Sequence, residues 1–208
     1  MIVRSRAAGR PQTRPDWDHQ RTLHGLIHNE LERFARERAG DEAWERAVRD
    51  AGLAGRIYIT TERYDDTEAL ALVVALAKIT DIGPQALLEG FGEALVPTLV
   101  SNYGSLIAPE WRTLDLIEHT EELIHTALRA SDPSARPPML RVLRRGDDEV
   151  LVIYASERRM CGVAKGIVRG LATHYGENVT IEEESCMLSG AGSCTLAIRR
   201  TAVSRRVA

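Results

Sequence analysis

The position of His125 in the sequence allows two roles: its imidazole could bind a metal, or it could be a hydrogen-bonded residue of the core. It stands in EELIHTALRASDPSARPP (121–138), where an amphipathic helix passes into a loop that ends in two prolines. Ile124 and Leu128 mark the apolar side of this helix, so His125 faces the interior or its edge. A histidine there is more often a hydrogen-bonded core residue than a ligand, and this residue alone does not decide between the two.

A short polar row in YASER, made of Tyr154, Ser156 and Arg158, is suited to binding an anion. Side chains alternate between the two faces of a strand, so these three are predicted to share one face. All three donate hydrogen bonds, and arginine can bind a carboxylate through two parallel bonds. The row predicts a site for a ligand with two carboxylates, and the alternative is a solvated strand face.

Three cysteines, Cys161, Cys186 and Cys194, could bind one metal ion. Cys161 opens a predicted helix, and the other two flank the turn of a predicted hairpin. Three thiolates that converge can hold a tetrahedral ion such as zinc. The alternative is three separate core thiols. Disulfides are disfavoured because the number of cysteines is odd and the protein is expected to be cytoplasmic.

The elements that must position these residues divide into a helical part and a sheet-bearing part. Residues 1–22 are rich in arginine and proline and are predicted to form a basic disordered tail, with a second tail at 201–208. Helical periodicity marks most of 23–130, where Pro97 is expected to kink or end one helix. In 137–200, alternating apolar and polar residues predict a hairpin and a second strand pair, and a helix is predicted between them.

The predicted fold class is α+β, with a seam between the two parts near 131–138. The helix that carries His125 is predicted to run from about Arg112 to Arg129. Asp66 or Thr67 is expected to cap the helix TEALALVVALAKIT.

Composition excludes several classes of function. The chain has 208 residues, a formal net charge of −3 and a pI near 6.1, which argues against a nucleic-acid-binding surface. No apolar run approaches the roughly 20 residues that cross a bilayer. The amino terminus lacks the apolar stretch of a secretory signal. We therefore expect a cytoplasmic protein with no nucleic-acid or membrane partner.

Several motifs occur in an order typical of one family. They are HGLIHNEL (24–31), YDDTEALALV (64–73), GFGEALVPTL (90–99), a histidine shortly before a Pro-Pro pair, and Y-x-S-x-R. Together they make residues 23–200 similar to haem–nitric oxide/oxygen binding (H-NOX) domains, which include the sensor domain of soluble guanylate cyclase and stand-alone bacterial gas sensors. The resemblance implies an H-NOX-like fold. In it, haem lies between the helical part and a four-stranded antiparallel sheet with one helix packed on it.

The resemblance assigns roles to the histidine and to the polar row. His125 would be the proximal ligand of the iron in haem b, a role suited to neutral imidazole. Tyr154, Ser156 and Arg158 would hydrogen-bond the haem propionates. Pro138 would be a rigid wedge against the macrocycle, because its φ is fixed.

The opposite side of the implied haem is lined by apolar side chains. The matching positions are Ile27, Leu31, Leu95 and Val163, and Val163 stands where members that bind dioxygen stably have a tyrosine. An apolar pocket offers no hydrogen bond to bound dioxygen, whereas bound nitric oxide needs none. The resemblance therefore implies a nitric oxide sensor that discriminates against oxygen. Without a distal acid–base pair, we expect no enzymatic activity.

The resemblance also favours the metal interpretation of the cysteines. Some bacterial H-NOX proteins bind a structural, redox-responsive zinc through three cysteines and a histidine, at a spacing similar to that of Cys161, Cys186 and Cys194. The histidine would lie three residues before Cys186, where this chain has Glu183. Glu183 or His174 could complete the site, or the site could be empty.

The function that the resemblance implies is signalling to a separate protein. Nitric oxide at ferrous haem would weaken or break the iron–histidine bond, and the helical part would then move relative to the sheet. We expect no effector domain after residue 200, so the expected partner is a separate histidine kinase or a cyclic-di-GMP enzyme. Two alternatives remain. One is a cysteine/zinc redox switch in which haem is secondary. The other is a non-haem small-molecule module of the vinyl-reductase-like type, which ESCMLSGAGSCTLAI also resembles.

Overall fold

The computed structural model describes residues 22–201. The rest of the two predicted tails, 1–21 and 202–208, lies outside this range, whereas Thr22 begins a strand and Thr201 ends one. The α-helices are α1 (Gly25–Ala39), α2 (Asp41–Asp50), α3 (Asp66–Thr80), α4 (Pro84–Tyr103), α5 (Thr113–His119), α6 (Thr126–Ser131) and α7 (Cys161–Tyr175). The strands are β1 (Thr22–His24), β2 (Arg63–Asp65), β3 (Met139–Arg144), β4 (Glu149–Ala155), β5 (Asn178–Ser185) and β6 (Cys194–Thr201).

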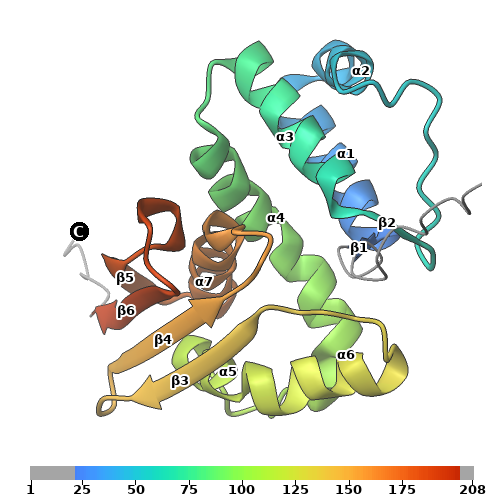
Figure 1. Ribbon diagram of the computed structural model, residues 1–208. Helices are drawn as coiled ribbons and strands as arrows, with labels where there is room; N and C mark the ends of the chain where they lie inside the picture. Colours follow the sequence, from blue (N-terminus) through green and yellow to red (C-terminus); the bar gives the residue numbers. More distant parts are fainter. Residues whose placement is uncertain (1–21, 202–208) are drawn as a thin grey trace, which may run out of the picture.

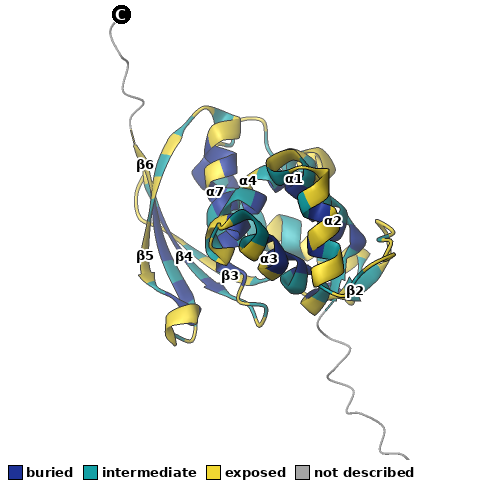
Figure 2. Cartoon of the chain, turned by 90° about the horizontal axis from the view of Figure 1, so that it is seen from above, coloured by how far each residue is buried: buried dark blue, intermediate teal, exposed yellow. Residues whose placement is uncertain are grey.

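The architecture is α+β, with the division that the sequence predicts. Figure 1 shows α1, α2 and α3 on one side of α4, and the sheet with α7 on the other. In the view from above, α4 and α7 lie between the sheet and the first three helices (Figure 2). α4 therefore carries core residues of both parts: Leu87, Leu88, Phe91 and Leu95 face the helical core, and Val96 faces the sheet core.

A small antiparallel ribbon joins the beginnings of α1 and α3. Thr22 pairs with Asp65 and His24 with Arg63. The loop before β2 packs so closely on α1 that a Cβ at Gly25 would lie 2.0 Å from the Ile59 carbonyl oxygen. Only glycine fits at this contact, so the ribbon and the first turn of α1 form one unit.

The start of α3 differs from the prediction by one residue. Asp65, and neither Asp66 nor Thr67, is the N-cap, and its side chain accepts a hydrogen bond from the Thr67 amide at 2.9 Å. Asp66 is instead buried in the first turn. Because it does not cap the helix, the Asp66 carboxylate is available for an ion pair inside the protein.

α4 does not end at Pro97 but continues to Tyr103. Proline removes one backbone hydrogen bond from a helix interior, and tertiary packing can offset this loss. α4 packs along α7 through glycines on both helices: a Cβ at Gly92 would lie 2.3 Å from the Val163 carbonyl oxygen, and one at Gly166 would lie 1.9 Å from the Glu89 carbonyl oxygen. This close backbone contact holds α4 to the sheet-bearing part.

The sheet has the strand order β3-β4-β6-β5, with every neighbouring pair antiparallel. Alternate residues of its central strands, Val150, Val152, Leu196 and Ile198, are buried together with residues of α5 and α7. The predicted hairpin turn at 146–148 joins β3 to β4, and Gly146 there has φ of +89°. The alternation of apolar residues along the strands thus gives the sheet one apolar face, which helices cover, as predicted.

The helix that carries His125 is not a uniform α-helix. After α5, residues Thr120–His125 form a π-helical segment, and α6 follows directly. The Thr126 hydroxyl donates to the Glu121 carbonyl oxygen at 3.2 Å within this wider turn. Sequence periodicity does not distinguish such a segment from an α-helix, and π-turns occur often at functional sites.

Within residues 22–201, no single helix is both long and apolar enough to cross a membrane. α3 and the helical stretch Pro84–Leu106 pass that test of length and composition only as a pair, with a bend of 112° between them.

Candidate functional site

His125 lies at the end of the π-helical segment, and its ring is largely covered. Its side chain is 12% exposed, and Nδ1 lies 2.9 Å from Oε2 of Glu121. Burial lowers the pKa of His125 below its ordinary value, so the ring is neutral at neutral pH. Because a carboxylate can only accept, the proton is on Nδ1 and the Nε2 lone pair is available to a metal. Nε2 makes no hydrogen bond to any residue that the structure describes.

Glu121 is a residue of this site that sequence analysis missed. Its carboxylate accepts from His125, from Arg129 at 2.7 Å and from the Leu140 amide at 3.2 Å. Burial alone would raise the pKa of Glu121, but these hydrogen bonds hold the pKa below its ordinary value. The i,i+4 spacing of Glu121 and His125 was a usable signal, because residues at this spacing are neighbours on a helix.

The polar row is not a row along one strand face. β4 ends at Ala155, so of the three residues only Tyr154 lies in the strand. Ser156 and Arg158 occupy the following turn, where the Arg158 amide donates to the Ser156 hydroxyl at 3.3 Å. The predicted alternation fails because the chain leaves the sheet after Ala155 and turns toward α7.

Tyr154 is buried at the end of β4. It pairs with Leu140 of β3 and with Cys194 of β6. Burial raises the pKa of Tyr154 to about 12, so the phenol stays protonated and can donate a hydrogen bond.

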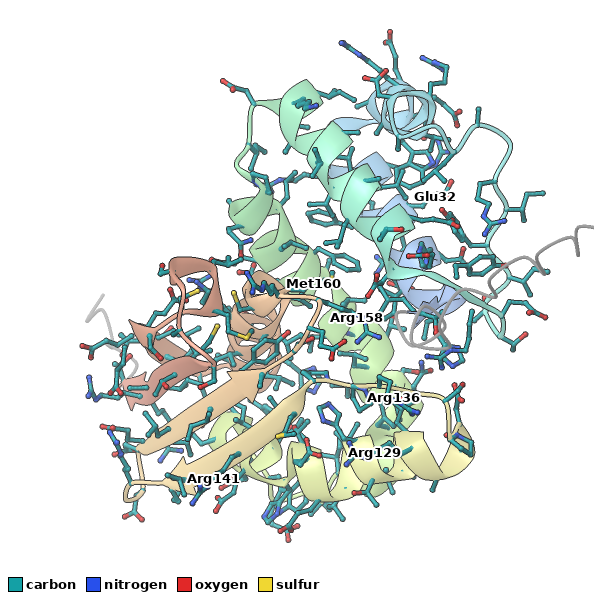
Figure 3. The ribbon with its side chains drawn as sticks, in the orientation of Figure 1. Glu32, Arg129, Arg136, Arg141, Arg158 and Met160 are labelled. Atoms are coloured by element: carbon teal, nitrogen blue, oxygen red, sulfur yellow. The ribbon has the colours of Figure 1, made fainter. Side chains whose placement is uncertain are left out.

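Arg158 joins three segments that are distant in the sequence. Its guanidinium donates to the Arg136 carbonyl oxygen at 2.6 Å and to the Thr22 carbonyl oxygen at 2.9 Å, and its Nε lies 3.2 Å from Oδ2 of Asp66. Figure 3 shows Arg158 and Arg136 where the turn after β4 and the loop before β3 face the helical part. Burial lowers the pKa of Arg158, which indicates a cation with reduced hydration. An anionic ligand would be favoured at this position.

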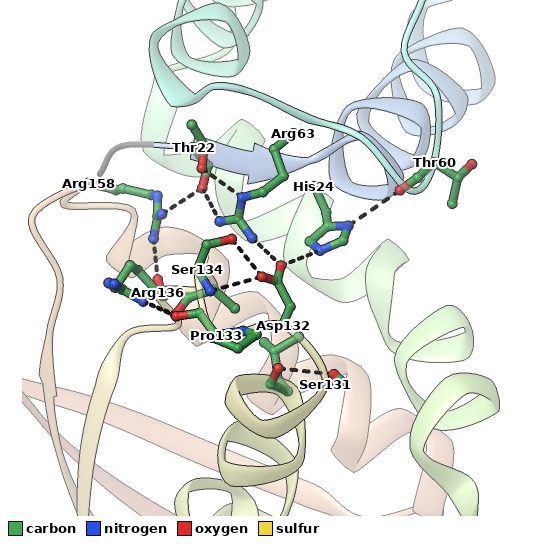
Figure 4. A network of polar contacts seen from close by, with 12 residues as sticks. Thr22, His24, Thr60, Arg63, Ser131, Asp132, Pro133, Ser134, Arg136 and Arg158 are labelled. Atoms are coloured by element: carbon green, nitrogen blue, oxygen red, sulfur yellow. Dashed lines mark hydrogen bonds and ion pairs between the residues drawn. The ribbon is translucent and has the colours of Figure 1, made fainter. Parts of the chain in front are cut away.

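A second polar cluster lies beside Arg158, in the loop after α6 (Figure 4). The Asp132 carboxylate accepts from His24 at 3.0 Å, from Arg63 and from the Ser134 hydroxyl at 2.6 Å. The Ser134 hydrogen bonds lead several interactions that hold the pKa of Asp132 well below its usual range. The cluster ties the loop that follows His125 to the β1–β2 ribbon of the helical part.

Replacing Asp132 with alanine is expected to lower the free energy of unfolding by about 1.5–3 kcal/mol, the range for hydrogen bonds to charged groups. Because folding depresses the pKa of Asp132, its stabilisation is present above the unfolded-state pKa of about 4 and is lost as the pH falls below it. Urea unfolding at neutral pH and at pH values below about 4 measures this.

The difference between wild type and Asp132→Ala should therefore shrink in acid. The matched control is Asp147→Ala, since Asp147 is exposed and its carboxylate has no hydrogen bond within the described chain. An equal loss for both variants, or a pH-independent loss for Asp132→Ala, would contradict the assigned role of the cluster.

The four apolar residues predicted for the distal side lie in one hydrophobic core. Leu31 and Leu95 are buried there, and Ile27 and Val163 pack against it. This core also contains Phe91 of α4 and is separate from the sheet core. The structure therefore brings together residues of α1, α4 and α7 that the sequence separates widely.

Two surface hollows lie elsewhere, and both are lined by the loop that follows α2. One, of about 400 Å³, is lined by residues 52–56 and Glu68. The other, of about 290 Å³, extends between this loop and Trp44. Neither hollow is lined by a residue that the resemblance assigns to haem.

The three cysteines converge. Their Sγ atoms lie within 4.8 Å of one another, and Cys186 is 3.8 Å from both Cys161 and Cys194. A tetrahedral site with metal–sulfur bonds of about 2.3 Å has edges of about 3.8 Å, so the donor set fits zinc. The Met187 amide also donates to the Cys194 sulfur at 3.3 Å, but burial outweighs this hydrogen bond and raises the pKa of Cys194. Burial raises the pKa of Cys161 to about 12, so this thiol is protonated without a metal.

The two candidates for a fourth ligand do not join this cluster. Glu183 pairs with Lys165 at 2.9 Å, and the cluster contains no carboxylate or imidazole from the described residues. His174 lies 13 positions after Cys161 on the same helix, which is about 20 Å along its axis. The side-chain oxygen of Gln85, 4.0 Å from the Cys161 sulfur, is a neighbouring oxygen that sequence analysis did not consider.

A comparison with protein-family models decides the family. The model described as Haem-NO-binding matches residues 24–183, well over half of the chain. The chain belongs to the haem-NO-binding (H-NOX) family. The family match favours the haem interpretation over the vinyl-reductase-like module. A search of curated proteins gave no match for this H-NOX chain.

Solved structures of H-NOX proteins have the same fold. An H-NOX protein from S. oneidensis in the Fe(II)NO state matches with a TM-score of 0.80 at 23% identity, over 86% of this chain and 100% of the other. Unliganded Fe(II) H-NOX from K. algicida gives 0.80 at 21% identity, over 89% and 100%. A point mutant of T. tengcongensis H-NOX gives 0.75 at 19% identity, over 88% and 100%.

The side chains of this H-NOX chain fit a haem on their own chemistry. His125 offers a neutral imidazole whose Nε2 is free of hydrogen bonds to the described residues. Arg158 and Arg63 both donate to the Thr22 carbonyl oxygen, at 2.9 and 3.3 Å, so two guanidinium groups converge on one backbone oxygen. Guanidinium groups suit the carboxylates of haem propionates. The apolar core around Leu31 supplies surface for a porphyrin face.

Proposed function

We propose that this protein is a haem-based nitric oxide sensor with His125 as the proximal ligand. The observation that carries the proposal is the hydrogen bond from His125 Nδ1 to Glu121, which leaves Nε2 free to bind iron. When bound to His125, a ferrous haem would supply the iron that binds the gas. The chain itself acts as a sensor and contributes no catalytic group.

Arg158, with Tyr154 and Ser156 beside it, would hold the haem propionates. The guanidinium of Arg158 is positioned by backbone carbonyl groups of Thr22 and Arg136, which a ligand carboxylate can replace. Pro138 stands between this cluster and β3, and its fixed φ keeps that part of the chain rigid. Together these residues would hold and orient a bound haem.

Selectivity for nitric oxide over oxygen comes from the distal side chains. Ile27, Leu31, Leu95 and Val163 carry no hydrogen-bond donor, so a polar bound dioxygen gains no stabilisation. Nitric oxide needs no such hydrogen bond in order to bind.

The signal leaves the protein through the loop after α6. This loop carries Asp132, which links it to His24 and Arg63 of the helical part. A change in the position of His125 is passed along α6 to this cluster and alters the contact between the two parts. The recipient is a separate signalling protein, a histidine kinase or a cyclic-di-GMP enzyme.

The test is the absorption spectrum of the reduced protein alone, under air and with nitric oxide. We expect a five-coordinate ferrous spectrum that does not change to an oxygen complex under air and changes on addition of nitric oxide. A stable oxygen complex would refute the proposed selectivity, and a protein that takes up no haem would refute the sensor function.

A second candidate function is a zinc-linked redox switch at Cys161, Cys186 and Cys194. It is supported by the 3.8 Å sulfur–sulfur distances, which match a tetrahedral thiolate site. A two-electron oxidant such as a peroxide would join two of the thiolates in a disulfide and be reduced itself, which would release the metal and loosen the β5–β6 hairpin from α7. Metal analysis of anaerobically purified protein tests it, and protein without zinc would exclude it.

A further inference from the structure

We infer that Glu121 is a positioning residue that sets the ligand strength of His125 and couples this histidine to strand β3. The inference rests on the proposed function, in which His125 binds the haem iron. It concerns three contacts of one carboxylate with His125, Arg129 and Leu140.

The first contact controls the imidazole. Oε2 of Glu121 lies 2.9 Å from His125 Nδ1. A carboxylate partner holds the histidine in the Nδ1–H tautomer, fixes the ring plane and increases electron donation from Nε2. An anionic partner does this more strongly than a neutral carbonyl oxygen, because a hydrogen bond to a charged acceptor is stronger.

The other two contacts hold the carboxylate in place. Arg129 Nη2 is 2.7 Å from Oε1, and the Leu140 amide is 3.2 Å from Oε2. Glu121 is therefore bound on both oxygens and from both sides, by a residue of α6 and by a strand. A glutamate held in this way keeps its distance from His125, whereas an exposed glutamate samples many rotamers.

The hydrogen bond from the Leu140 amide couples Glu121, and through it His125, to the sheet. Leu140 is the second residue of β3 and pairs with Tyr154 of β4. Through Glu121, a displacement of His125 acts directly on β3 and on the strand that carries Tyr154. This route is independent of the Asp132 cluster, which connects the same helix to the other part of the protein.

The experiment compares Glu121→Gln and Glu121→Ala with Glu122→Gln as the matched control. Glutamine keeps the size and an acceptor oxygen but removes the charge, while alanine removes the contact. Glu122 is the exposed neighbour, so its variant controls for the loss of one negative charge. The measurements are the iron–histidine stretching frequency of the reduced protein, the haem reduction potential and the haem affinity.

We expect both Glu121 variants to lower the stretching frequency and to raise the reduction potential, with the control unchanged. Glu121→Ala should also weaken haem binding by about 10–100-fold, the range for loss of a partner of a metal-bound histidine. After addition of nitric oxide, a smaller fraction of the Glu121→Gln protein should retain the iron–histidine bond.

A frequency and a potential equal to those of the control in Glu121→Gln would overturn the inference. The glutamine variant preserves shape, so it provides this test even if the alanine variant does not fold. Failure of the proposed function looks different, because wild type itself would then bind no haem or show no iron–histidine band.

Discussion

Replacing His125 with alanine is expected to abolish stable haem binding while leaving the fold in place. His125 is the one residue among those assigned to haem that offers a free imidazole nitrogen, and its largely covered ring lies outside the hydrophobic core clusters. Losing the ligand itself should reduce haem affinity by more than the roughly 10–100-fold that loss of an outer-shell partner costs. Haem content and the absorption spectrum of the reduced variant measure this.

The control for this prediction is His119→Ala. His119 belongs to α5 and stacks on Trp111 with ring centroids 4.4 Å apart, so its loss removes a histidine from the same region without touching Glu121. We expect the control to retain haem, and added imidazole to restore a histidine-like spectrum to His125→Ala. Full haem content and an unchanged spectrum in His125→Ala would refute the assignment of the proximal ligand.

Replacing Gly166 with alanine is expected to be strongly destabilising. The new Cβ would lie 1.9 Å from the Glu89 carbonyl oxygen and 2.9 Å from the Gly92 Cα, and both are backbone atoms of α4. The clash can be relieved only by moving α4 and α7 apart, which opens the contact between the two core clusters. We expect a loss of about 3 kcal/mol or more, the upper range for overpacking, despite the better helix propensity of alanine. Urea unfolding followed by circular dichroism measures it.

Gly104→Ala is the matched control for Gly166→Ala. It is the same substitution at the end of α4, where φ is −55° and no heavy atom lies within 4 Å of the added Cβ. Its effect should lie between zero and a stabilisation of about 1 kcal/mol, because alanine restricts the unfolded chain. If the two variants had equal midpoints, the close contact of α4 and α7 would not be a determinant of stability.

Local sequence patterns determined most of the secondary structure. The apolar spacing of α1 and α3 and the alternation of β4 and β6 arise from neighbours along the chain, so they are visible without the tertiary structure. The same holds for Gly146 in the β3–β4 turn, where φ is positive. The motifs around His125 and Tyr154 indicated the family, which the family model confirms.

Where local patterns were misleading, long-range packing was the cause. Pro97 removes a backbone hydrogen bond, yet α4 continues to Tyr103, and Val100 beyond the proline packs against the sheet core. Ser156 and Arg158 continue the alternation of β4 in sequence, but the strand has ended at Ala155. The π-helical turn at His125 also has no signature in the 3.6-residue period.

Only the tertiary structure decided the polar connections of the site. Arg158 bonds to Thr22 across 136 positions, and Asp132 bonds to His24 across 108. Such contacts depend on how the helical part and the sheet-bearing part pack against each other. A hydrogen bond forms between them only where donor and acceptor come within about 3 Å. The sequence by itself therefore determined which side chains could hold a haem, while the docking of the two parts determined which partners orient them.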